Sequence, residues 1–121
     1  MEKKLYREEL TQMEINAHRA SLNGEPAVYC GTYGKYNNGD ISGMWVDVAS
    51  FTDYEEFMEF CERVHADEED VELMFQDYEG FPYAWYSESG MGEETFDKIK
   101  EFAKLTDNER EAYEVYLNNH D

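Results

Sequence analysis

In two short stretches of the chain, the sequence pattern has a period of two, so that successive side chains would point to opposite faces. This is the pattern of a half-buried strand. The first runs from Ala27 to Tyr33 and the second from Met44 to Val48. Between them, Asn37-Asn38-Gly39-Asp40 contains an Asn-Gly pair, which tolerates positive φ and marks a turn. The pattern predicts an antiparallel hairpin with a long connection.

From Asp53 to about His65 the apolar positions recur every three to four residues, as they do along one side of a helix. Thr52 precedes this stretch and Glu55 follows three residues later, which is the pattern of a capping box. We therefore expect an amphipathic helix that begins at Thr52. Its apolar stripe is Tyr54, Phe57, Met58, Cys61 and Val64.

Helical spacing also occurs near both ends of the chain. The stretch from Lys3 to Leu22 predicts one amphipathic helix that packs on the main body. Two further helices are expected, one from about Glu93 to Leu105 and one that starts at a capping box over Thr106 to Glu109. The inward residues expected for these last two are Phe96, Ile99 and Ala103, and Ala112, Tyr113, Tyr116 and Leu117.

The segment from Glu72 to Tyr78 fits both a short helix and a strand. Leu73 and Phe75 alternate with Glu72 and Met74, which slightly favours the strand. Residues 83–92 form an aromatic-rich connection with two glycines, and we expect irregular structure there.

Charge is the most unusual property of the chain. Of 29 Asp and Glu residues, 18 lie between Tyr36 and Asp97, where Arg63 is the only basic residue, so this segment carries a net charge of −17. Carboxylates at this density repel one another and destabilise the compact state, so the composition indicates a function in binding. The expected partner is a polycation, while phosphates and anionic lipids would be repelled, which argues against direct nucleic-acid or membrane binding.

Several classes of protein are disfavoured by the remaining residues. No apolar run is long enough to span a bilayer and the first ten residues are too polar for a signal peptide, so we expect a cytoplasmic protein. Cys30 and Cys61 lack metal-ligand spacing and are expected to be buried thiols. The three histidines are scattered and no nucleophile motif occurs. We expect neither an enzyme nor a resident cofactor or metal.

The formal net charge of −19 invites comparison with DNA. A compact chain of this length has a radius of gyration of about 14 Å and spans roughly 35 Å. Over that length duplex DNA presents on the order of 20 phosphate charges. The carboxylates most suited to imitate phosphates lie on the helix after Thr52 and in the segments that follow it. The candidate partner-binding residues are Asp53, Glu55, Glu56, Glu59, Glu62, Asp67, Glu68, Glu69, Asp70, Glu72, Asp77 and Glu79.

Other interpretations of the same acids remain open. For any one acid, a solvated helix face is the simplest interpretation, and an acidic surface also suits life in high salt. An acidic protein-interaction or divalent-cation-binding module is the main alternative, although the run from Asp67 to Asp70 lacks the EF-hand pattern. Calcium titration by calorimetry would distinguish a divalent-cation-binding module from a DNA mimic. A small carboxylate-dependent hydrolase would need one carboxyl with a raised pKa in a cleft.

Three segments closely resemble the ArdA antirestriction family. They are the run from Ala27 to Gly39, AVYCGTYGKYNNG, the triplet Gly43-Met44-Trp45, and the run from Leu73 to Pro82, LMFQDYEGFP. The likeness extends from about Ala27 to Asn119, and its glycine, tyrosine and tryptophan positions agree in order and spacing.

This resemblance implies an acidic, elongated protein from a mobile genetic element that imitates bent DNA and occupies the DNA-binding groove of type I restriction-modification enzymes, without catalysis. It implies an α+β fold: a small three-stranded, mainly antiparallel sheet with one packed helix, followed by a helical lobe, with the N-terminal helix as an addition. The expected divisions are residues 1–24, 25–80 and 81–121. Family members usually continue into a further domain that carries a homodimer contact, and we expect this chain to end near its start.

Overall fold

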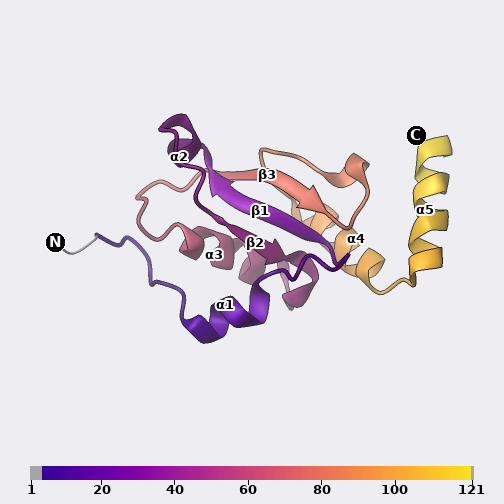
Figure 1. Ribbon diagram of the computed structural model, residues 1–121, viewed down its shortest axis with the longest axis horizontal. Helices are drawn as coiled ribbons and strands as arrows, with labels where there is room; N and C mark the ends of the chain where they lie inside the picture. Colours follow the sequence, from indigo (N-terminus) through magenta and orange to yellow (C-terminus); the bar gives the residue numbers. More distant parts are fainter. Residues whose placement is uncertain (1–3, 121) are drawn as a thin grey trace.

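A three-stranded antiparallel sheet in the order β2-β1-β3 forms the centre of the protein. The structure is a computed structural model that describes residues 4–120. The central strand β1 (Ala27–Thr32) pairs with β2 (Met44–Asp47) and with β3 (Leu73–Glu79), as Figure 1 shows. The α+β class, the hairpin and the strand in the ambiguous third segment are confirmed.

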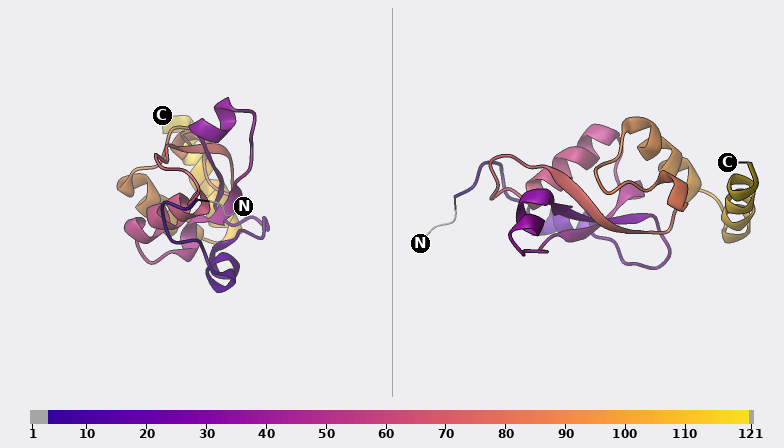
Figure 2. Two further views of the ribbon diagram at one scale, coloured as in Figure 1. Left: turned by 90° about the vertical axis from the view of Figure 1, so that its left-hand side faces the viewer. Right: turned by 90° about the horizontal axis from the view of Figure 1, so that it is seen from above.

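The strand register gives the sheet one buried face and one open face. Val28 lies opposite Val46, and both side chains are buried. One residue along, Tyr29 lies between Trp45 on one side and Asp77 on the other, so these three side chains share the opposite face. Figure 2 shows helices α3 and α4 together on one side of the sheet. The other side is left without a helical layer of this kind.

Helix α3 (Tyr54–Val64) and helix α4 (Glu93–Ala103) build the core against the buried face. The ring of Phe57 stacks on Phe75 of β3 and on Phe96 of α4, with centroids 6.0 and 5.5 Å apart. A buried aromatic side chain removes a large apolar area from water, so this ring cluster is a main source of stability.

The predicted apolar stripes of these two helices are largely confirmed. Phe57 and Cys61 are fully buried, as are Phe96 and Ile99, whereas Ala103 is only half-buried. Two further buried side chains lie outside the stripes expected from the sequence, namely Phe60 and Phe102. The real buried arcs are therefore wider than a single stripe because each helix has neighbours on two sides.

The N-cap of α3 is Asp53, so the prediction of Thr52 was wrong. The Asp53 carboxylate accepts a hydrogen bond from the Glu56 backbone nitrogen at 2.8 Å. Glu56 in turn accepts from the Thr52 backbone nitrogen at 2.9 Å. Thr52 and Asp53 are both good caps with a glutamate three residues later, so the sequence pattern fitted two registers.

The connection between β1 and β2 contains a short helix that the alternation pattern did not reveal. Tyr33 was expected in the strand, but β1 ends at Thr32 because the Thr32 hydroxyl accepts from the Lys35 backbone nitrogen and caps α2 (Tyr33–Asn37). Gly39 has a φ of +78°, in agreement with the predicted turn. Strand β2 also ends one residue early, and a 3-10 turn, η1 (Val48–Ser50), follows.

The N-terminal helix is much shorter than the expected stretch from Lys3 to Leu22, of which the first residue lies outside the described range. Helix α1 covers only Gln12–His18. Thr11 caps it and forms a complete capping box with Glu14. The helix therefore starts at this capping box rather than near Lys3.

The segments on either side of α1 are not helical, and other parts of the protein satisfy some of their backbone groups. Tyr6 donates its backbone N–H to the Ala66 carbonyl at 2.8 Å. Ala20 donates to the Trp45 carbonyl at 3.1 Å, beside the edge of β2. These bonds replace the i to i−4 bonds of a longer helix.

At the other end, the aromatic connection contains a 3-10 turn, η2 (Tyr83–Trp85), and the chain finishes with α5 (Asp107–His120). The predicted capping box is confirmed, since the Thr106 hydroxyl accepts from the Glu109 backbone nitrogen and the Glu109 carboxylate accepts from the Thr106 nitrogen. Among residues 4–120 no helix is long and apolar enough to cross a membrane.

The buried stripe expected for α5 was wrong. Tyr113 and Tyr116 are 40% and 56% exposed, Ala112 is exposed, and Leu117 is only half-buried. Figure 1 shows the reason: α5 lies at the far end of the molecule, set across the rest of the chain. Its apolar side meets the body mainly through the ring of Tyr113, 5.9 Å from that of Trp85.

Cys30 and Cys61 are confirmed as buried, free thiols. The Cys30 thiol donates a weak hydrogen bond to the Cys61 carbonyl, with a sulfur to oxygen distance of 3.7 Å. Both cysteines therefore serve as small core residues between β1 and α3.

Candidate acidic binding surface

The outward side of α3 carries a row of carboxylates, which we call the α3 acidic face. Because Phe57, Phe60 and Cys61 face the core, the intervening positions must face solvent. Most of these acids are exposed, and Glu62 is half-buried. The α3 acidic face consists of Asp53, Glu55, Glu56, Glu59 and Glu62.

Within the described residues, no side-chain hydrogen bond or ion pair engages Glu55, Glu59 or Glu62. Asp53 and Glu56 use one oxygen each for the start of the helix. These carboxylates are therefore available for direct contacts with a partner.

Arg63 is the basic residue on α3, and its direct ion pair is with Glu14 of α1, although it lies in the same groove as Glu59. Its Nη1 lies 2.6 Å from Glu14 Oε2 and its Nη2 lies 2.9 Å from Glu14 Oε1. Its remaining donors reach the backbone carbonyls of Glu8 and Glu9. The guanidinium holds the pKa of Glu14 down at about 2, with the Thr11 backbone hydrogen bond as a second cause.

These contacts bring more acids to the same surface. Glu8 and Glu9 are exposed and lie beside α3 because Arg63 holds their backbone there. A groove of about 390 Å³ runs between α1 and α3, with Glu14 and Glu59 among its lining residues. Sequence reasoning missed these N-terminal acids because the first 24 residues are neutral as a whole; the contact with α3 only exists in the fold.

The loop after α3 is less available than its charge suggests. Lys35 Nζ lies 2.9 Å from Asp67 Oδ1, and the Thr32 hydroxyl donates to Glu68 Oε1 at 2.6 Å. These two acids hold the loop against α2. The next two, Glu69 and Asp70, are exposed.

A buried histidine completes this anchor. His65 Nε2 donates to the Cys30 carbonyl at 2.9 Å, and its Nδ1 accepts from Lys35 Nζ at the same distance. An ammonium group has only donors, so the pattern assigns the proton of the neutral ring to Nε2. The charge of Lys35 is thereby fixed inside the loop rather than spread over the acidic surface.

The acids of β3 lie on the other side of the molecule. Asp77 pairs with Tyr29 and Glu79 with Ala27, so both belong to the open face of the sheet, opposite the layer of α3. Both are exposed, and Glu72, just before the strand, is exposed as well. The acids of α3 and those of β3 therefore lie on opposite surfaces rather than on a single ridge.

The open face also carries an acid that was not in the candidate set. Asp47 lies in the same row as Ala27 and Glu79. Burial raises the pKa of the Asp47 carboxyl, and the negative charge of Glu25 raises it further. Its position at the end of β2, where it caps η1 through the Ala49 nitrogen, explains why it is partly enclosed.

The described residues do not form a metal-binding site. Among them, no group of three or more His, Cys, Asp or Glu side chains is arranged to hold a metal ion. The acids stand in rows, separated by helix and strand geometry.

The comparison with protein families decides which family this fold belongs to. The family model described as Antirestriction protein (ArdA) matches residues 28–121, most of the chain. The chain is a member of the ArdA antirestriction family. The matched part runs from β1 to α5 and includes all twelve candidate acids, whereas α1 lies outside it. No curated protein and no solved structure gave a significant match.

Membership of the ArdA family indicates which class of protein the acidic surfaces would bind. An antirestriction protein acts against restriction-modification enzymes, and those enzymes bind DNA. The expectation of a restriction-modification partner therefore agrees with the family. Within this ArdA protein, Glu14 of the neutral N-terminal segment engages Arg63 through two guanidinium nitrogens.

Proposed function

We propose that the protein is a DNA mimic that binds type I restriction-modification enzymes in the groove that normally holds DNA, and so blocks restriction without catalysis. The observation that carries the proposal is the α3 acidic face, a row of mostly exposed carboxylates in which Glu55, Glu59 and Glu62 make no side-chain hydrogen bond or ion pair among the described residues. Three residues along a helix rise about 4.5 Å, which is similar in scale to the spacing of phosphates.

The distribution of acids over two surfaces supports binding inside a cleft. A duplex presents phosphates on every side, so an enzyme that encloses DNA carries basic side chains on both walls of its groove. The α3 acidic face would meet one wall, and Asp77 with Glu79 on the open face of the sheet would meet the other. The elongated outline in Figure 1 suits a groove rather than a flat surface.

Charge complementarity of this kind mainly accelerates association and makes binding depend on salt. The cytoplasm is the compartment in which a restriction enzyme would be met. A homodimer would extend the acidic surfaces, and sedimentation analysis of the free protein would show whether one forms.

Competition with DNA tests the proposal. The methyltransferase core of a type I enzyme is loaded with a fluorescent duplex that contains its recognition site, and the protein is titrated in. We expect displacement of the duplex, mutual competition when the order of addition is reversed, and steep weakening as salt rises. Simultaneous binding of DNA and protein, or unchanged affinity at several hundred millimolar salt, would contradict the proposal.

A further inference from the structure

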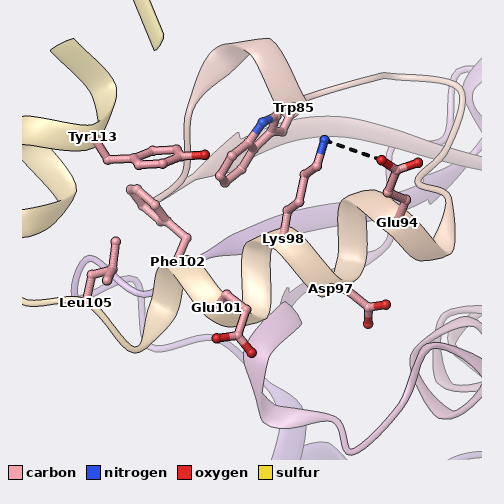
Figure 3. Close-up of a pocket in the computed structure, with 8 residues that line it drawn as sticks. All are labelled: Trp85, Glu94, Asp97, Lys98, Glu101, Phe102, Leu105 and Tyr113. Atoms are coloured by element: carbon pink, nitrogen blue, oxygen red, sulfur yellow. Dashed lines mark ion pairs between the residues drawn. The ribbon is translucent and has the colours of Figure 1, made fainter. Parts of the chain in front are cut away.

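A pocket of about 500 Å³ lies at the C-terminal end of the molecule, between α4, η2 and α5. Figure 3 shows aromatic rings from all three elements around it. Its apolar wall consists of Trp85, Phe102, Leu105 and Tyr113. A cavity of this size with an aromatic wall and a few polar groups has the general form of a binding site.

The polar side of the pocket comes from one side of α4. Glu94, Asp97, Lys98 and Glu101 line it, with Leu105 just past the end of the helix. Their spacing of three or four residues places them on the side of α4 that faces away from the buried Ile99. The pocket therefore forms where this side of α4 and the side of α5 that carries Tyr113 lie next to each other.

Two hydrogen bonds keep α5 in that place. Arg110 Nη2 donates to the Ala103 carbonyl at 2.8 Å, and its Nη1 donates to the Gly24 carbonyl at 3.1 Å. The guanidinium also lies over the ring of Phe102, 5.6 Å from its centroid. The ring of Tyr113 contacts Phe102 of α4 edge-on, with centroids 6.2 Å apart, and it stays 40% exposed.

The charges around the pocket favour a cation. Three carboxylates line it against one ammonium group, that of Lys98, which lies 3.7 Å from Glu94 in a well-exposed pair. Lys104 outside the pocket is 3.0 Å from Glu101. Asp97 has no ion pair within the described residues. The total charge of −19 adds a long-range field of the same sign.

We propose that this pocket binds a segment of a partner protein in which a large apolar side chain stands next to arginine or lysine. The apolar side chain would occupy the aromatic wall, and the cation would lie near Asp97 and Glu101. A second copy of this chain is disfavoured as the occupant because two molecules of charge −19 repel each other. The pocket shares no residue with the α3 acidic face, so this proposal can be tested independently of DNA mimicry.

Short peptides provide the probe. The cationic apolar peptide Arg-Leu-Arg-Phe-Arg-Leu is compared with three relatives, in which Glu replaces Arg, Gln replaces Arg, or Ala replaces the apolar residues. The Trp45→Phe variant leaves Trp85 as the sole tryptophan, and its fluorescence reports on the pocket. We expect saturable binding of the first peptide with a change in Trp85 emission. Weaker binding is expected for the Gln and Ala peptides, and none for the Glu peptide.

Variants of the pocket locate the binding. Truncation of a central aromatic contact commonly weakens binding by about tenfold or more, which is the effect expected for Tyr113→Ala. Tyr113→Phe keeps the ring and should bind as the parent does. Glu101→Gln should weaken binding by about two- to fivefold at low salt. Glu111→Gln is the matched control, because Glu111 is exposed on α5 and does not line the pocket.

Four results would overturn the proposal. One is equal binding of the Ala peptide, which would indicate general attraction to an acidic protein. Another is equal binding of the Glu peptide. The third is an unchanged Trp85 signal, and the fourth is equal loss of affinity in Glu101→Gln and Glu111→Gln. If Tyr113→Ala fails to fold, the glutamate pair and Tyr113→Phe still decide the matter. Loss of peptide binding with intact DNA competition would reject this proposal alone.

Discussion

Arg63 of α3 and Glu14 of α1 form a two-pronged ion pair, with nitrogen to oxygen distances of 2.6 and 2.9 Å. Between Tyr36 and Asp97 this arginine is the only basic residue. Because Glu14 and the carbonyls of Glu8 and Glu9 use its donors, the guanidinium makes no direct hydrogen bond to the outward carboxylates of α3.

The ion pair should make part of the stability depend on pH. The folded-state pKa of Glu14 is about 2, below the ordinary value of 4.5 for a glutamate, so its contribution is present above about pH 4.5 and is lost as pH falls toward 2. Glu14→Gln should therefore melt at a lower temperature than the parent at pH 7, and the difference should shrink as pH is lowered through this range. Thermal unfolding at stepped pH, followed by circular dichroism, measures it.

The control for that experiment is Glu9→Gln, which removes an exposed carboxylate in the same segment and leaves the Glu9 carbonyl in contact with Arg63. A pH-independent gap for Glu14→Gln, or the same behaviour in Glu9→Gln, would mean that the ion pair does not act as described.

Neutralising the α3 acidic face should impair binding without harming the fold. In the double variant Glu55→Gln/Glu59→Gln, two like charges four residues apart are removed, which should raise stability by a few tenths of a kcal/mol. Association with the restriction enzyme should slow by about tenfold at low salt. The double variant Glu111→Gln/Glu114→Gln on α5 has the same change in charge. Equal effects of the two double variants, measured by stopped-flow or surface plasmon resonance, would show that only net charge matters.

Binding inside a cleft predicts a contribution from the open face of the sheet. Glu79→Gln removes one exposed carboxylate there, opposite the α3 layer. We expect it to weaken DNA competition by about two- to fivefold, in the range of an exposed ion pair. If Glu79→Gln competes as the parent does while the α3 double variant fails, the enzyme contacts one side only.

Repulsion among the carboxylates should make the protein more stable in moderate salt. Raising ionic strength from 0.01 to 0.15 M shortens the screening length from about 30 to about 8 Å, which weakens repulsion between separated surface charges. The melting temperature should rise equally in NaCl and KCl. A flat or falling response would mean that the charges are well separated or paired, and a much larger rise with CaCl₂ at equal ionic strength would favour a divalent-cation module.

Two glycines with the same backbone angle offer a matched test of the sheet edge. Gly39 and Gly80 have φ of +78° and +79°, so alanine costs about 1–2 kcal/mol at either position. At Gly80 a Cβ would also collide with the Glu25 carbonyl, whereas at Gly39 nothing lies within 4 Å. Gly80→Ala should therefore be less stable than Gly39→Ala by about 1–3 kcal/mol in urea unfolding. Equal losses would argue against the close approach of these two chain segments.

Local patterns predicted most of the regular structure. The alternation around Val28, the apolar stripe around Phe57 and the capping box at Thr106 all depend on neighbours in sequence, and each is present in the fold. Where two local solutions fitted equally, as with Thr52 and Asp53, the pattern could not choose between them. The segment from Leu73 to Glu79 is a strand because β1 offers it a hydrogen-bonding edge, which is a non-local cause.

The amino-acid sequence by itself determined the charge, the amphipathic helix with carboxylates along one side, and membership of an antirestriction family, because these properties reside in residue type and spacing. Only the tertiary structure decided where the charges face. The strand register sends Asp77 to the side opposite α3, the pairing with Glu14 ties Arg63 to α1, and the hydrogen bonds of Arg110 fix α5 beside α4, where an aromatic pocket forms. These outcomes depend on contacts between residues far apart in the chain, which local periodicity does not contain.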